Sequence, residues 1–420
     1  MQSSETISLL RSKIVKILTL LLLIRLGLYI PVPNIDLNLF ESSKNSNIVF
    51  GFAKTLTGSS FLGIGSLGIL PYINSSILIQ LLTSVFPSLE RLQKEEGELG
   101  RQKINRYTRY LTFGWAIFLS AIIAFGFVKP LVFNWSLFLA LKIILSLTTG
   151  SLLSMWFAEL ITEEGLGNGS SMIIFINIIG SIPNSFKELT QKLAGESYGN
   201  NILFFIQCSI VYLFIVLIIV IFQYSYKKIV ITSAKQLNLN YNDQTSQSSE
   251  LKNSYIPLKL NQGGIMPLVF SSTVATLLYY PLQLFAGSSI GQSIAILPKI
   301  LTLCTYTLNI GLVIVFSCFY AVLVLKPADI SQNLAKMAYN VPGIRQGNET
   351  TKYLEQIVIR ISFMGGLFLA FLAFFPIILS NFFQFNLFKN VTSLLILIGV
   401  ITDTTSQIRG YLLSRNYESF

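Results

Sequence analysis

The sequence predicts an all-α polytopic membrane protein, and three observations lead to that fold class. Of its 420 residues, 52% are hydrophobic and 12% are charged, with a mean hydropathy of +0.63, which is outside the range of soluble globular domains. Apolar runs of roughly 20 residues, long enough to cross the hydrocarbon of a bilayer, recur about ten times. Lysine and arginine concentrate in alternate loops, which the positive-inside rule assigns to the side of synthesis.

The predicted spans follow from the positions of the apolar runs, and both chain ends then face the side of synthesis. The ten spans cover residues 17–32, 69–86, 107–128, 136–162, 169–186, 202–223, 264–282, 303–325, 357–380 and 391–408.

The first span follows a short arm that carries Arg11, Lys13 and Lys16. Cations before an apolar stretch are also typical of a signal peptide. No small-residue cleavage site follows here, however, and Arg25 with two nearby prolines favours a span that is retained. We expect the protein to be made in the compartment where it works.

A glycine-rich stretch, FGFAKTLTGSSFLGIGSLGILPYI, lies between the first two spans. It is too interrupted to cross a bilayer. Irregular backbone at membrane depth is tolerated only where protein buries it or water reaches it, so we expect a half-helix packed inside the bundle. A re-entrant or external loop fits the composition equally well.

Two long polar loops on the side of synthesis carry clustered cations, at residues 224–262 and 326–356. Positive-inside bias with contact to anionic lipid headgroups accounts for such loops. The alternative is a docking surface for an acidic or RNA-bearing partner, because clustered cations speed association and hold carboxylate or phosphate groups.

The composition argues against an enzyme. Histidine is absent, which removes the commonest general base and a common metal ligand. Cys208, Cys304 and Cys318 lie inside apolar stretches, where cysteine behaves as a small hydrophobe. An intramembrane serine protease would want histidine, and an aspartyl protease needs two intramembrane aspartates where only Asp403 is available. We expect no catalytic residue, no metal and no cofactor.

An ion-coupled secondary transporter is the main alternative function. It requires ionisable groups deep in the spans around a broken helix. The candidates are Arg25, Lys142, Glu159 and Asp403. Three of them, Arg25, Glu159 and Asp403, fall near span ends or within the sequence motifs quoted below, which leaves Lys142 isolated.

Six blocks of sequence, spread over nearly the whole chain, resemble the SecY/Sec61-alpha family of plastid-encoded type, and they occur in the order that this family shows. They are RLGLYIPVPNID at 25–36, GILPYINSSILIQLL at 68–82, GELGRQKINRYTRY at 97–110, ITEEGLGNGSSMIIF at 161–175, YIPLKLNQGGIMP at 255–267 and VPGIRQGNETTKYL at 341–354.

The resemblance implies a protein-conducting channel without enzymatic activity of its own. Unfolded preproteins would cross the membrane through a central pore, and hydrophobic segments would leave sideways into lipid. The family fold implies two inverted five-helix halves, here 1–187 and 188–420, and an odd number of spans in each half agrees with inversion.

The resemblance also implies a ring of apolar side chains at the bilayer midplane, which excludes water by dewetting yet folds aside around a peptide. Aliphatic residues at these positions would otherwise be ordinary bundle packing, and Ser170 departs from the aliphatic residue that the family prefers. The implied ring is Ile69, Ile73, Ser170, Ile174, Val269 and Ile396.

The glycine-rich stretch corresponds to the family's plug, about 50–65, with Phe50, Gly51, Gly58, Phe61, Gly63 and Gly65. Polar residues on the inner faces of spans two, seven and eight are candidates for the lateral gate, although structural hydrogen bonding between helices explains them as well. These gate candidates are Asn74, Gln80, Thr273 and Asn309.

Arg345 matches the family's arginine for docking a motor or a ribosome, and Lys227, Lys228 and Lys235 match its basic loop. The implied partners are a SecE-like subunit, a SecG-like subunit, the SecA ATPase, the ribosome and signal recognition machinery, a YidC-type insertase, preproteins and membrane lipid. Abundant Ile, Asn, Lys and Phe, together with the GLGNGSSMIIFINI block, favour a plastid origin and the thylakoid membrane; the bacterial inner membrane is the alternative.

Overall fold

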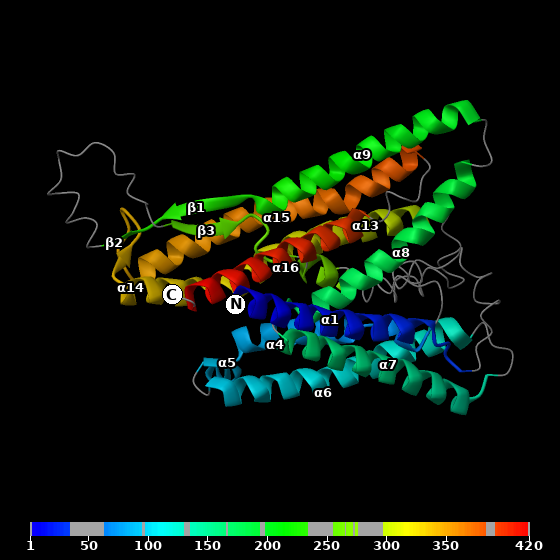
Figure 1. Cartoon of the computed structure of the whole chain (residues 1–420), viewed down its shortest axis with the longest axis horizontal. Helices are drawn as coiled ribbons and strands as arrows, with labels where there is room; N and C mark the ends of the chain where they lie inside the picture. Colours follow the sequence, from blue (N-terminus) through cyan, green and yellow to red (C-terminus); the bar gives the residue numbers. More distant parts are fainter. Residues whose placement is uncertain are drawn as a thin grey trace. The chain divides into compact units, whose positions relative to one another are not determined.

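The structure of the chain is a computed structural model, and it describes residues 2–33, 63–94, 97–129, 135–164, 167–193, 198–233, 255–264, 266–271, 274–275, 297–383 and 391–418. Helices dominate these residues (Figure 1). They are α1 (Gln2–Tyr29), η1 (Ile64–Leu67), α4 (Leu70–Val85), α5 (Pro87–Lys94), α6 (Gly97–Ile123), η2 (Ala124–Val128), α7 (Leu137–Glu163), α8 (Gly169–Leu193), α9 (Tyr198–Tyr224), α13 (Leu297–Leu325), α14 (Pro327–Lys336), α15 (Asn348–Phe383) and α16 (Val391–Glu418).

The four strands are short and form two antiparallel pairs. β1 (Tyr226–Val230) pairs with β3 (Tyr255–Lys259), and β2 (Thr232–Ser233) pairs with β4 (Tyr339–Asn340). Both pairs come from the two long basic loops that the sequence separates from the spans.

The helical prediction is confirmed. All the predicted spans but one overlap a described helix of this list, and the remaining span, 264–282, is described as helical at 266–271 and 274–275. Four helices in the described part of the chain are long and apolar enough to cross a membrane. The count of ten spans stays a prediction.

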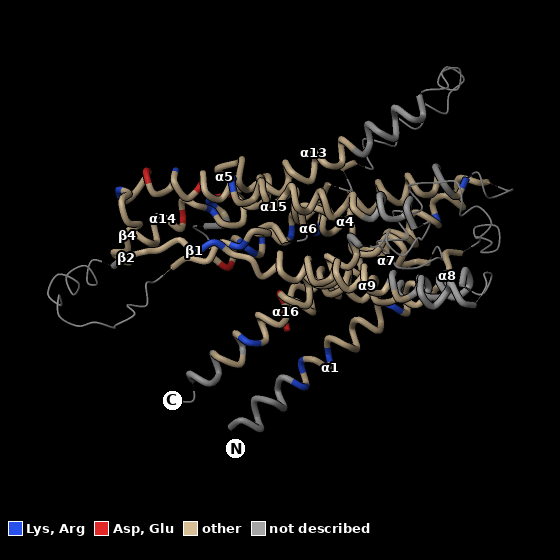
Figure 2. The backbone as a smooth tube through the Cα atoms, turned by 90° about the horizontal axis from the view of Figure 1, so that it is seen from above, with Lys and Arg blue, Asp and Glu red and all other residues tan. Residues whose placement is uncertain are grey.

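Several helices extend beyond the apolar runs that predict them. α1 begins at Gln2, α6 at Gly97 and α15 at Asn348, well before the first strongly apolar residues. Each extension is mainly polar. It stays helical because a helix that has already been nucleated in the membrane can continue into water, where its polar side chains find partners or stay solvated. In Figure 2, lysine and arginine residues mark α1 and lysines mark β1.

The chain folds as two compact units. One comprises Met1–Cys208 and Leu379–Phe420, and the other comprises Ser209–Ile378. These units are defined by packing and differ from the halves predicted from topology, since α16 joins the first unit. The division into halves therefore stays a prediction.

In the first unit, α7 is the central helix and contacts α1, α6, α8 and η1. Small residues bring its neighbours close. A Cβ at Gly150 would collide with the Ile64 carbonyl of η1, and one at Gly169 of α8 would collide with the Ala158 carbonyl. The hydroxyls of Ser120 and Thr148 lie 3.3 Å apart between α6 and α7. Such close backbone approach is the usual way in which helices pack within a bilayer.

In the second unit, α9, α13 and α15 pack through aromatic and small residues. The rings of Phe222 and Phe368 stack with centroids 4.0 Å apart, joining α9 to α15. The Ser317 hydroxyl of α13 donates to the Ser362 carbonyl of α15 at 3.2 Å. A separate apolar cluster, which includes Ile229, Leu258 and Leu354, lies beneath the β1–β3 pair.

Candidate functional site

The predicted ring residues of the first unit are all buried. Ile69 and Ile73 lie at the start of α4 with 3% and 2% of their surface exposed, and Ile174 on α8 has 5% exposed. Ile396 lies on α16 with 8% exposed, and α16 packs against α8. The remaining member, Val269, belongs to the second unit and is 2% exposed. The assembly of these residues into one ring stays a prediction.

Ser170 has a local role in the first turn of α8. The side-chain oxygen of Asn168 accepts hydrogen bonds from the Ser170 amide at 3.1 Å and from the Ser170 hydroxyl at 2.8 Å. Asn168 thus caps the helix, as Asn does at N-termini. Because the hydroxyl proton is already engaged within the turn, a serine here perturbs an apolar ring less than an unpaired hydroxyl would.

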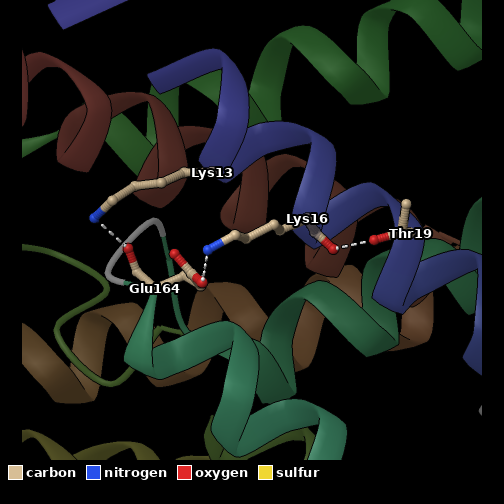
Figure 3. Close-up of polar contacts among 4 residues, drawn as sticks. All are labelled: Lys13, Lys16, Thr19 and Glu164. Atoms are coloured by element: carbon tan, nitrogen blue, oxygen red, sulfur yellow. Dashed lines mark hydrogen bonds and ion pairs between the residues drawn. The ribbon is translucent and has the colours of Figure 1, made fainter. Parts of the chain in front are cut away.

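The tight turn before α8 depends on glycine and on a tie to α1. Gly167 has φ +105°, a left-handed conformation that side chains rarely adopt, and the Gly169 amide donates to the Thr162 hydroxyl at 3.0 Å. Lys13 of α1 donates to the Glu164 carbonyl at 2.8 Å, and Lys16 pairs with the Glu164 carboxylate at 2.9 Å (Figure 3). These contacts between α1 and Glu164 were not predicted from the sequence. The only signal for them is the two lysines three residues apart together with the two adjacent glutamates in ITEEG.

The end of the predicted plug segment is anchored. Gly63 forms a bridge with Pro31, and the Ile64 amide donates to the Ile30 carbonyl at 2.9 Å. Gly63 and Gly65 both pack against the backbone at the end of α1. The other predicted plug residues lie outside the described residues: Phe50, Gly51, Gly58 and Phe61. The described end of the predicted plug segment is therefore held against α1.

The predicted gate residues have mixed environments. Asn74 is 4% exposed on α4, while Gln80 donates within its own helix to the Ser76 hydroxyl at 3.5 Å. Asn309 is half-buried on α13 in the second unit, and Thr273 lies outside the described residues. The lateral gate stays a prediction.

The two basic loops, which the sequence predicts to be a docking surface, meet in one structure of the second unit. We call it the docking platform and define it as β1–β4 with the turn 341–347; its docking role stays a prediction. Lys227 and Lys228 are exposed on β1, and the Lys228 ammonium lies 4.9 Å from the Tyr255 ring centroid. β2 pairs with β4, which leads directly into the turn that carries Arg345. Lys235 lies outside the described residues.

Arg345 is presented by a well-defined turn. Its side chain is exposed, while its carbonyl accepts a hydrogen bond from the Thr350 hydroxyl at 2.7 Å at the start of α15. Gly343 and Gly347 flank it with φ values of +81° and +97°. The turn is thus fixed at its base and leaves the guanidinium free to meet a carboxylate or a phosphate, whose shape its planar fork matches.

The candidate transporter residues occupy separate local environments in the first unit. Glu159 pairs with Arg109 at 2.9 Å across α6 and α7, and the Lys142 ammonium lies 4.5 Å from the Phe138 ring centroid of its own helix. Arg25 lies against Gly180 of α8. An ion-coupling site needs such groups to converge, so these contacts favour structural roles for Glu159 and Lys142.

Comparison with known proteins gives one consistent result. A profile of the SecY family matches residues 63–405. The protein translocase subunit SecY of Emiliania huxleyi is 64% identical over 100% of this chain and 99% of its own length. The protein translocase subunit SecY of Synechocystis sp. is 39% identical over 97% of this chain and 93% of its own length.

Solved structures agree on the fold. A structure described as that of a protein conducting channel has a TM-score of 0.66 at 15% identity, and the match covers 95% of this chain and 92% of that one. A second structure, whose description concerns the plug domain of SecY, has a TM-score of 0.63 at 14% identity. That match covers 94% of this chain and 91% of the other. The whole-length identity to translocase subunits and the matching fold place this chain in the SecY family.

Proposed function

We propose that this chain is the protein-conducting channel of a Sec translocase, which passes unfolded preproteins across a membrane and releases hydrophobic segments sideways into lipid. The observation that carries this proposal is the identity to translocase subunits along the whole chain. The buried aliphatic residues on α4, α8 and α16 support it, because an apolar constriction is what such a channel needs.

The constriction works through the shape and polarity of its lining. At rest, the aliphatic side chains of the predicted ring offer water no hydrogen-bond partner, so the pore dewets and ions do not pass. These side chains belong to Ile69, Ile73, Ile174, Val269 and Ile396. Aliphatic side chains change rotamer at little cost, and they fold around an extended peptide. The channel itself carries out no covalent chemistry, so the energy for transport comes from a partner.

The partners follow from the docking platform and the family. Arg345, Lys227 and Lys228 present cations to an acidic surface or to phosphates, which suits a SecA ATPase or the RNA of a ribosome. A SecE-like subunit and a SecG-like subunit would complete the channel, with signal recognition machinery and a YidC-type insertase acting beside it. We propose that the protein lies in the thylakoid membrane. Relatives from algae and cyanobacteria support this location, and a bacterial inner membrane is the alternative.

Reconstitution tests the proposal. Vesicles that contain this chain, a SecE-like subunit and a SecA ATPase should protect a secretory precursor from added protease only when ATP is supplied. Vesicles without this chain are the control. A correctly inserted, ATPase-binding chain that protects no precursor would contradict the proposal.

A further inference from the structure

α8 carries a buried polar residue, Asn177, one helical turn beyond the predicted ring residue Ile174. Ser170, Ile174 and Asn177 are spaced i, i+4 and i+7, which places them on one face of the helix. All three are buried, and Asn177 is the most buried of them at 2% exposed. Because α8 leads away from the side of synthesis, Asn177 follows Ile174 along the path of an exported chain.

The side-chain oxygen of Asn177 has no hydrogen-bond partner among the described residues. Buried polar atoms in folded proteins are almost always paired, so an unpaired one calls for an explanation. Its neighbours Ile173 and Ile178 are buried apolar residues and offer no side-chain donor. Within the described part of the chain, the oxygen is therefore free to accept a hydrogen bond from another molecule.

A second unpaired atom lies on the same side of α8. A Cβ built at Gly180, three residues after Asn177, would collide with the guanidinium of Arg25, so this side chain crosses from α1 onto α8 at that point. Nη1 of Arg25 is buried and also lacks a partner within the described part of the chain. Three helical residues rise by about 4.5 Å, so Asn177 and the point where Arg25 meets α8 lie about one turn apart along the helix.

The two unpaired atoms, the Asn177 side-chain oxygen and Nη1 of Arg25, match the hydrogen-bonding groups on the main chain of an extended polypeptide. Each residue of such a chain carries one N–H donor and one C=O acceptor, and both lose their water while they pass an apolar ring. A chain that leaves the ring first meets an acceptor, Asn177, and then a cationic donor, Arg25. Contacts with the main chain ignore side-chain identity, as transport of many different precursors requires.

We propose that Asn177 and Arg25 form a binding site for the main chain of the translocating polypeptide, directly beyond the ring. This inference rests on the proposed function. In transit, an N–H of the substrate donates to the Asn177 oxygen, and a C=O of the substrate accepts from Nη1 of Arg25. At rest the two atoms are held ready by the α1–α8 contact at Gly180.

Asn177→Leu tests the site through two opposed effects. Leucine removes the unpaired polar atom and keeps a similar volume, so the variant should unfold in detergent at the same or a higher temperature. It also removes the acceptor, so ATP-driven translocation should slow about fivefold, the change that one net hydrogen bond gives. A variant that is equally stable and transports at the wild-type rate would overturn the proposal. Wild-type vesicles that transport nothing would instead refute the proposed function.

A modified precursor separates main-chain contact from a structural role. A precursor made by ligation, with ester bonds replacing amides over a central segment, lacks the N–H donors there. The proposal expects the wild-type channel to pass this precursor more slowly than its all-amide counterpart, and Asn177→Leu to add no further delay. If the variant slows both precursors by the same factor, Asn177 acts on the helix bundle and the site is wrongly assigned.

Discussion

Single residues determine how closely the elements around the pore approach one another. The backbone of Ile64 packs directly against Gly150 of α7, and the backbone of Leu28 at the end of α1 packs directly against Gly63. These contacts fix η1, which leads into the predicted ring residues at the start of α4. The position of Ile69 and Ile73 therefore depends on glycines that have no chemistry of their own.

Gly150→Ala should destabilise the protein. The added Cβ collides with the carbonyl of Ile64, and backbone cannot move aside as a flexible side chain would. Overpacking of this kind costs about 1–3 kcal/mol, so the variant should unfold at a lower temperature in detergent. Gly114→Ala on α6 is the matched control, because an added Cβ there meets no atom within 4 Å. Equal thermal stability of the two variants would rule out the close contact.

Arg345→Glu should impair motor-driven translocation while the protein still inserts into the membrane. Reversing a charge that pairs with a partner costs about 2 kcal/mol or more in typical interfaces, so we expect a loss of about thirtyfold or more in rate. Arg345→Lys should have an intermediate effect, because it keeps the charge and loses the planar fork.

Lys352→Glu is the control for this prediction. It makes the same change of sign at an exposed residue of α15, close to the Arg345 turn. Arg345→Glu and Lys352→Glu should therefore differ clearly in ATP-dependent precursor protection. Transport by Arg345→Glu at the wild-type rate would remove Arg345 from the docking surface.

The sequence predicted the buried aliphatic residues well and the polar contacts poorly. Ile73 and Ile174 lie in apolar runs within recognisable blocks, so their burial follows from pattern alone. The tie between Lys16 and Glu164 joins residues that are far apart in the chain, and no periodicity connects them. The capping of α8 by Asn168 was equally invisible, because it depends on the geometry of one turn.

At the scale of elements, two distant loops combine into one structure. The pairings of β1 with β3 and of β2 with β4 tie residues 226–233 to 255–259 and to 339–340. Alternation along the β1–β3 pair buries Ile229 and Leu258 on the apolar cluster and leaves Lys228 exposed. Composition predicted only two basic loops, since strands this short leave little signal in a sequence.

The plug prediction can be tested as an element. Deletion of 50–62 should raise the resting ion conductance of the channel, because the segment that seals the pore is lost. The stretch from Gly63 to Leu67 must be kept, since its contacts with α1 and α7 hold the start of α4. Conductance of single channels in planar bilayers is the measurement.

A deletion of equal length in the polar loop, 236–248, is the control and should leave the resting conductance unchanged. A channel that stays tight without 50–62 would reject the plug assignment. A leak in both variants would show that the measurement reports general damage and would equally count against it.

At the scale of the whole molecule, the family and the helical membrane fold were predicted from sequence and are confirmed. Blocks in a fixed order along the chain, such as GILPYI and GNGSSMIIF, carry that information because each has one place in the family fold. Packing into units did not follow from the same signals. α16 packs with α8 in the first unit, and apolar spans give no indication in sequence of which neighbour they choose.

The central claim is that a polypeptide passes through this bundle, and crosslinking tests it most directly. A photo-crosslinker is placed at Ile174, with a control at Leu217, which is 53% exposed on α9. Both are used in membranes where a secretory precursor is stalled midway through transport. The account predicts that the precursor is captured at Ile174 and not at Leu217. A precursor confirmed to be in transit that is never captured at Ile174, Ile73 or Val269 would contradict it.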